Sequence, residues 1–318
     1  MRSTLGGATL ATTTAVAWGG QFVVGKSALG RVDAFHVTTV RYALAGLVLL
    51  ALLAAVEGPG ALRLDGKGLR LWWLGTLGFG GFNLLGYTGL AHSRPQSASL
   101  IVALAPLLTA LVLWRRSGVR PSRGTFLALA VALAGVALVI SGGDPASIGR
   151  GSVGYGDALV LGGVLSFILY TLGAAEFAQL SPLRYTTLTA GLGWLSIAAA
   201  TVVASAAGLE PEPSPGAYAD VRWQILYIAL VGAVVAVVSW NAAVVALGPQ
   251  NASLFGNLIP VTTFAIEVAR GYRPGALELA GAALTIAALV AGNVLARRPR
   301  TQRAEESPQP AFEQAKAA

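Results

Sequence analysis

The chain has 318 residues, of which 55% are hydrophobic and only 11% are charged, and its mean hydropathy is +0.67. A soluble domain carries about 25% charged residues, so this composition excludes a water-soluble globular protein and indicates that lipid is the solvent. Cysteine is absent and histidine occurs twice, which excludes disulfides and thiolate metal sites and gives no reason to expect a metal or a cofactor.

Apolar runs long enough to cross a bilayer follow one another along the chain. We predict about ten spans, at roughly 8–29, 34–56, 69–91, 97–115, 124–141, 154–174, 183–207, 222–247, 251–269 and 275–295. The first run continues through Trp18 and Gly19 with no clear cleavage site, so we interpret it as an uncleaved first helix and not as a signal peptide.

One short phrase occurs twice. The segment PQSASL at 95–100 recurs as PQNASL at 249–254, and Pro106 recurs at the same interval as Pro260. Self-similarity at a fixed offset of about half the chain indicates an internal duplication. Because each half then holds an odd number of spans, the second half enters the membrane upside down. The predicted fold is an all-α membrane protein in which two five-helix inverted repeats form the bundle.

The predicted domains are a first repeat at 1–143, a second repeat at 150–296 and a disordered cytoplasmic tail at 297–318. With both termini in the cytoplasm, about 14 of the 22 Lys and Arg residues fall on the cytoplasmic side and about 7 on the other. The net charge of +8 therefore reflects topology, and it does not form the clustered patch that nucleic acid needs. We predict a multi-pass protein of the bacterial inner membrane, with its oligomeric state left open.

Several motifs resemble the EamA repeat, which defines the drug/metabolite transporter superfamily. Residues 17–22 (AWGGQF) with Lys26, and Arg41 in the next span, are similar to the opening of such a repeat. Glu267 and the Ala-Ser-Leu…Pro starts of the fourth and ninth spans also match. The resemblance covers about 8–295 in two copies and is greatest to YddG-type amino-acid exporters. It implies that the first, third, fourth, sixth, eighth and ninth helices surround a central cavity.

The second copy departs from this pattern, because Leu165-Ser166-Phe167 stands where the first copy has its Trp-Gly pair. In the first copy, Leu113-Trp114 stands where an acid comparable to Glu267 is expected. These departures argue against any role that requires two matched acids.

Polar residues inside the spans are candidates for the substrate path, because they are costly in lipid unless they face the bundle or water. Many lie about one helical turn apart on one face. The predicted substrate-binding residues are Trp18, Gln21, Asn83, Tyr87, Ser166, Tyr170, Trp240, Asn241 and Asn257. Amides and hydroxyls beside aromatic rings suit a small solute with an apolar part, and aromatic faces attract ammonium groups. The alternative for each is helix packing or an interfacial belt.

Tyr87 and Asn241 correspond under the repeat interval, so we expect them to face each other across one central cavity. Arg41 and Glu267 are candidates for an ion pair that gates the path, unless each snorkels to the interface independently. Pro106 and Pro260 are candidate hinges, because proline breaks a backbone hydrogen bond; static kinks are the alternative.

The predicted function is a secondary transporter that exports small metabolites by alternating access, with aromatic and other neutral amino acids as the favoured substrates. A drug or other metabolite carrier of the same superfamily is an alternative. A membrane-embedded transferase would need a nucleophile, metal ligands or paired acids near one interface, and the sequence shows no such cluster, so no enzyme is predicted. A channel is not excluded. Substrate identity, transport direction and coupling ion stay open.

Overall fold

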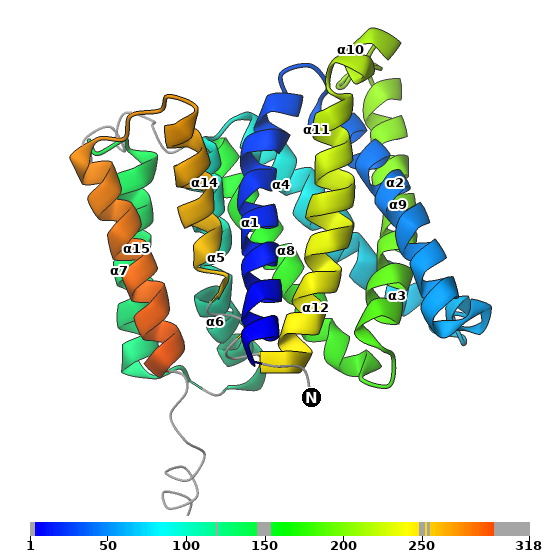
Figure 1. Ribbon diagram of the computed structural model, residues 1–318, viewed down its shortest axis with the longest axis horizontal. Coiled ribbons are helices and arrows are strands. Elements are labelled where there is room, and N and C mark those ends of the chain that lie inside the picture. The colour runs from blue at the N-terminus through cyan, green and yellow to red at the C-terminus, as the bar shows by residue number, and fades with distance from the viewer. Residues whose placement is uncertain (1–3, 119, 145–153, 248–251, 253–254, 296–318) are drawn as a thin grey trace, which may run out of the picture.

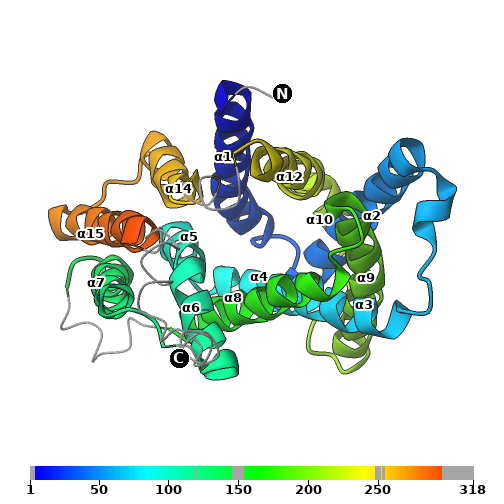
Figure 2. The same cartoon turned by 90° about the horizontal axis from the view of Figure 1, so that it is seen from below.

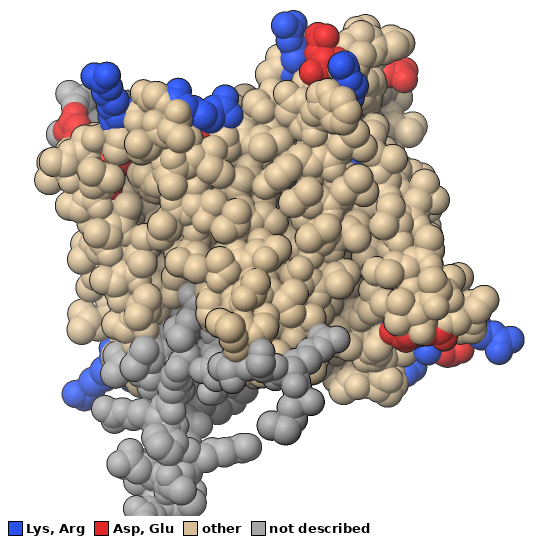
Figure 3. Space-filling view, in the orientation of Figure 1, with Lys and Arg blue, Asp and Glu red and all other residues tan. Residues whose placement is uncertain are grey.

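The computed structural model describes residues 4–118, 120–144, 154–247, 252 and 255–295. Every element in these ranges is a helix, which confirms the all-α prediction for the described part of the chain. Figure 1 shows most helices standing side by side between the same two ends of the molecule. In Figure 3 the Lys, Arg, Asp and Glu residues gather at those two ends and leave an uncharged band between them. This is the surface that a bilayer requires.

The first half begins with two long helices and continues with two interrupted ones. Its elements are α1 (Thr4–Ala28), α2 (Ala34–Glu57), η1 (Pro59–Leu62), α3 (Gly68–Gly75), η2 (Thr76–Gly81), α4 (Phe82–Ala91), α5 (Pro95–Ala103), α6 (Ala105–Ser117) and α7 (Arg123–Ile140). Asp33 begins α2, because its carboxylate accepts from the backbone N–H groups of Phe35 and His36. Gly118 ends α6 with a positive φ of 72°.

The second half follows the same order. Its elements are α8 (Tyr155–Gly173), η4 (Ala174–Phe177), α9 (Pro182–Ala206), α10 (Pro215–Asp220), α11 (Arg222–Leu226), η5 (Tyr227–Val235), α12 (Ala236–Leu247), α14 (Leu258–Ala269) and α15 (Ala276–Leu295). Each predicted span corresponds to one helix or one interrupted helical run. The predicted tail at 297–318 and most of the second repeated phrase at 249–254 lie outside the described residues.

Length and composition single out some of these runs as membrane spans. Five are long and apolar enough to cross a bilayer as single helices, and α5 with α6 qualifies as one broken span bent by 44°. The helix α14 and the segment 276–292 are shorter apolar helices. The third helix of each half has a π-helical middle, η2 in one and η5 in the other. Such wide turns often accompany function.

The two halves run in opposite directions. At the end of α1, Lys26 Nζ donates to the carbonyl oxygens of Leu90 and Ala91 at the end of α4, at 2.8 and 2.7 Å. Ser93 Oγ, just after α4, donates to Asp157 in the first turn of α8 at 2.5 Å. The second half therefore starts on the side at which α1 ends.

The packing of the helices repeats under exchange of the halves. The helix α4 of the first half packs on α8, the first helix of the second half, and in the same way α12 packs on α1. The helices α2 and α9, which correspond to each other, pack together, and so do α7 and α15. Figure 2 places α7 and α15 at one edge of the bundle. The two meet at glycines: a Cβ on Gly135 would lie 2.5 Å from the carbonyl oxygen of Gly281. This peripheral pair leaves the inner helices to form a site.

Both candidate hinge prolines lie in the first turn of a helix, and not in its interior. Pro106 is the second residue of α6, directly after the 44° break at Leu104. Pro260 is the third residue of α14. First-turn N–H groups have no partner within the helix, so neither proline removes a hydrogen bond from the helix it begins. Movement about these positions stays a prediction.

Candidate functional site

The most unusual buried group is the guanidinium of Arg41, in the first half of α2. Arg41 is 2% exposed, and it forms no ion pair with any acid in the described ranges. Nη1 donates to Asn83 Oδ1 at 3.0 Å and to the Tyr87 hydroxyl at 2.8 Å, while Nη2 donates to Gln21 Oε1 at 2.8 Å. Its Nε is buried without an acceptor among the described residues. A buried cation held by neutral oxygens keeps a desolvation cost of several kcal/mol, which makes it a candidate for function.

The three oxygens come from two helices of the first half. Gln21 lies in α1, and Asn83 and Tyr87 lie one turn apart in α4, so that both face α2. Asn83 Nδ2 donates to the carbonyl oxygen of Phe79 at 2.9 Å, which turns its own oxygen to Arg41. The backbone of η5 lies close by: a Cβ on Gly232 would be 2.2 Å from Gln21 Oε1. Glycine is therefore required there for the glutamine to keep this position.

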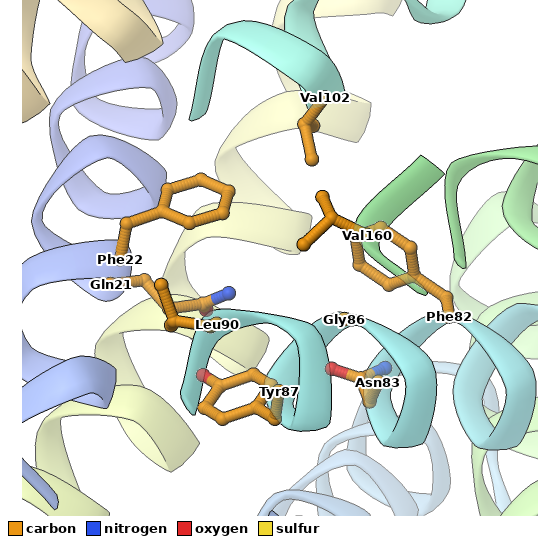
Figure 4. A pocket seen from close by; sticks show the side chains of 9 residues that line it. All are labelled: Gln21, Phe22, Phe82, Asn83, Gly86, Tyr87, Leu90, Val102 and Val160. Carbon is orange, nitrogen blue, oxygen red and sulfur yellow. The ribbon is translucent and has the colours of Figure 1, made fainter. Parts of the chain in front are cut away.

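A small pocket lies beside this cluster, as Figure 4 shows. Its lining residues come from α1, α4, α5 and α8 and are Gln21, Phe22, Phe82, Asn83, Gly86, Tyr87, Leu90, Val102 and Val160. Gln21, Asn83 and Tyr87 form a polar wall, and the remaining side chains form an apolar one. The volume of about 20 Å³ has room for one water molecule. A larger solute must widen the pocket.

An open cleft of about 360 Å³ lies at the end of the bundle where α1 ends. Its polar lining includes Lys26, His92, Ser93, Arg94, Ser97 and Asp157. Lys26 reaches from this cleft to the carbonyl oxygen of Leu90, whose side chain lines the pocket. This hydrogen bond therefore joins a residue of the cleft to a residue of the pocket.

Arg94 joins three helices at this end. Its guanidinium donates to the hydroxyl of Tyr272 at 3.0 Å, to Glu278 Oε1 at 3.3 Å, and to the carbonyl oxygens of Val139 and Ile140 at the end of α7. The Tyr272 hydroxyl donates to Glu278 Oε2 at 2.5 Å. Burial and the Glu278 carboxylate raise the pKa of Tyr272 to about 12, so the hydroxyl stays protonated at neutral pH. Arg94 therefore fixes the start of α5 to α7 and α15.

Comparison with known proteins identifies the class of this molecule. The model of the EamA-like transporter family matches twice, over residues 5–141 and 154–292. The chain belongs to the EamA-like transporter family. The two matches confirm the internal duplication, and the transporter acts on a small-molecule substrate in a lipid environment.

Relatives agree with this assignment over nearly the whole transporter. It is 30% identical over 296 residues to Uncharacterized transporter YrdR of Bacillus subtilis (strain 168), covering 92% of each chain. It is 29% identical over 290 residues to Uncharacterized transporter YyaM of the same organism, covering 91% of this chain and 94% of the other. A solved crystal structure of a protein 24% identical matches 94% of this chain and 100% of that one with a TM-score of 0.62, which bears on the fold alone.

Three predicted binding residues of the transporter, Gln21, Asn83 and Tyr87, come together at the pocket. Trp18 and Trp240 lie elsewhere and pack on each other, with ring centroids 5.6 Å apart, while Trp18 Nε1 donates to the Gly232 carbonyl oxygen at 3.0 Å. Neither Trp240 nor Asn241 lines the pocket. The helix α12 packs on α1 and η5, and Asn241 does not share the pocket with Tyr87 as we expected.

Two other predicted residues join helices. Ser166 Oγ donates to the Leu77 carbonyl oxygen in η2 at 2.7 Å. Tyr170 stacks on Tyr185 and meets the Phe79 ring edge-on, with centroids 5.3 and 5.4 Å away. Neither lines the pocket.

Asn257 precedes α14 and is also outside the pocket lining. It is 6% exposed, and its Nδ2 has no hydrogen-bond partner among the described residues. Its role in substrate binding stays a prediction.

The expected ion pair between Arg41 and Glu267 does not form in this structure. Arg41 makes its hydrogen bonds to Gln21, Asn83 and Tyr87, and Glu267 is partly exposed near the end of α14. The helix α14 packs on α1 and α5, whereas α2 packs on α9, α4 and η5. The helices that carry the two charges are therefore not direct neighbours.

The sequence analysis missed the apolar wall of the pocket and the contact of Lys26 with α4. Phe82, Gly86 and Leu90 recur at intervals of four in α4, which places them on one helical face. That face adjoins the one carrying Asn83 and Tyr87. The signal was therefore present, but an apolar stripe in a membrane helix is equally typical of lipid contact.

Proposed function

We propose that this transporter is an alternating-access carrier for small neutral amino acids and similar metabolites, and that it has no enzymatic role. The pocket supports the proposal, because it combines a polar wall for the charged end of a solute with an apolar wall for its side chain. Its lining includes Val160 of the second half beside residues of the first, and sites between halves suit alternating access. We also propose that the two repeats, 1–143 and 150–296, are the units that move relative to each other during transport.

The test is transport by purified protein in proteoliposomes. With unlabelled L-leucine inside the vesicles, labelled L-leucine outside is expected to enter by counterflow, and aromatic and aliphatic amino acids are expected to compete. Protein-free liposomes serve as the control. Entry at the same rate in both, for every amino acid tried, would rule out the proposed substrate class.

The orientation is a second part of the proposal, with export from the cytoplasm across the bacterial inner membrane. Lys and Arg are more abundant on the side that holds both termini, which predicts cytoplasmic termini and an outer loop at 208–221. Alkaline phosphatase fused after residue 298 is expected to be inactive, and phosphatase inserted within 210–216 is expected to be active. A periplasmic signal from the fusion after 298 would contradict this orientation.

A further inference from the structure

We propose, building on the function proposed above, that Arg41 turns the polar wall of the pocket into a set of hydrogen-bond donors and so selects substrates by a carboxylate group. The substrate class would be small apolar monocarboxylates, with amino acids among them. Arg41 does not line the pocket itself. It acts as a positioning residue through Gln21 and Tyr87, which do.

The first step is the direction of the hydrogen bonds. A guanidinium has five N–H donors and no acceptor, so every group that bonds to it must offer an oxygen. Gln21 Oε1 and the Tyr87 oxygen are both used in this way. What remains for a solute is the amide nitrogen of Gln21 and the hydroxyl proton of Tyr87. Figure 4 shows the Gln21 nitrogen pointing into the pocket, and it has no acceptor among the residues described.

The second step is charge. Among the described residues, none that lines the pocket is acidic, and those that accept from Arg41 are all neutral. The positive charge is therefore uncompensated one hydrogen bond away from the pocket, in surroundings where Coulomb interactions are stronger than in water. A carboxylate offers only acceptors and carries the opposite charge, whereas a carboxamide satisfies the same donors without the charge.

The third step is the opposite wall. Phe22, Phe82, Val102 and Val160 provide only carbon, so the other end of the solute must be apolar. A second carboxylate would meet no donor there and would lose its hydration. The ammonium group of an amino acid can instead lie against the face of Phe22 or Phe82.

The experiment compares three inhibitors that share one 3-methylbutyl group and differ in the polar group attached to it. They are 4-methylpentanoate, 4-methylpentanamide and 3-methylbutylamine, each tested against counterflow of labelled L-leucine by the full chain. The acid is expected to inhibit at a concentration about tenfold lower than the amide, because a charge-assisted hydrogen bond is the stronger one. The amine is expected to be the weakest.

Variants show whether Arg41 sets this preference. The acid-to-amide ratio is the inhibitory potency of the acid divided by that of the amide, about ten in wild type. Arg41→Gln should bring this ratio to about one. Arg41→Lys, which keeps the charge, should retain part of the preference for the acid. Tyr87→Phe and Gln21→Met leave Arg41 in place, and each should lower the ratio even if Arg41→Gln does not fold. Tyr185→Phe is the matched control. Its buried hydroxyl donates to the Tyr170 carbonyl oxygen at 3.2 Å, away from the pocket, and its ratio should equal that of wild type.

Each outcome decides a different point. Wild-type counterflow of leucine that acid and amide inhibit equally would overturn the role of the carboxylate and leave the carrier function standing. Absence of counterflow for leucine and for every other amino acid tried would overturn the proposed substrate class. The ratio would then be measured by thermal stabilisation of the purified protein, where selective stabilisation by the acid supports the inference. Equal stabilisation by both compounds, or none by either, overturns it.

Discussion

Gly193→Ala is expected to abolish the folded transporter, whereas Gly191→Ala, two residues away in the same helix, is expected to leave it intact. A Cβ on Gly193 would lie 2.4 Å from the carbonyl oxygen of Gly75, where α9 crosses α3. In the other direction, a Cβ on Gly75 would lie 2.1 Å from the carbonyl oxygen of Thr189. These neighbours are backbone atoms, so a rotamer change cannot relieve the contact.

The size of the effect follows from this difference. Overpacking in a core costs about 1–3 kcal/mol when side chains can adjust, and here two helices must separate, so we expect a loss of more than about 3 kcal/mol. A Cβ on Gly191 meets nothing within 4 Å, and alanine there gains up to about 1 kcal/mol of helix propensity. Size-exclusion profiles and melting temperatures in detergent measure both. Similar profiles for the two variants would mean that α3 and α9 do not cross at these glycines.

Much of the fold was predictable because lipid imposes a simple rule on the sequence. Each span must be apolar over its whole length and satisfy its own backbone, so the runs and the duplication could be read directly. The glycines of the third span allow close helix contact, as Gly75 shows against α9. The π-helical segments η2 and η5 carried no such signal. Their formation depends on the tertiary contacts of each helical turn, and the local amino-acid composition does not encode those contacts.

The site was predictable only in part. Gln21, Asn83 and Tyr87 stood out because polar side chains in lipid need a reason to be there. The expected partner of Arg41 was wrong. Charge pairing predicts that a buried arginine has an acidic partner, but it does not show which helices lie between the two residues. Asn241 was wrong for a geometrical reason. Inverted repeats place two corresponding residues at the same distance from the membrane midplane but on opposite sides of it. Tyr87 lies toward the end of the bundle where α1 ends. The helix α12, which carries Asn241, ends at the opposite side of the bundle, where it meets the start of α1 at Gly7.

Arg41→Met is expected to reduce leucine counterflow about 100-fold, the equivalent of losing two charge-assisted hydrogen bonds. Its melting temperature is expected to change by no more than about 5 °C. Replacing a buried charge with an apolar side chain of similar volume is often neutral or stabilising by about 1–4 kcal/mol. Against this gain, Gln21, Asn83 and Tyr87 each lose a donor, at about 1–3 kcal/mol apiece. They border a pocket with room for a water molecule, which can replace part of that loss.

Arg70→Met makes the same chemical change at the end of the bundle and serves as its control. Arg70 pairs with Glu176 at 2.5 Å, and both side chains are 49% exposed. An exposed pair of this kind is worth about 0–1 kcal/mol, so neither transport nor stability should change much. If Arg41→Met loses stability in proportion to transport, the arginine serves to hold α1, α2 and α4 together. If Arg41→Met keeps both its stability and its transport rate, the charge is not needed for transport. Only lost transport in a stable protein fits a cation that is retained, at a cost in desolvation, for the substrate.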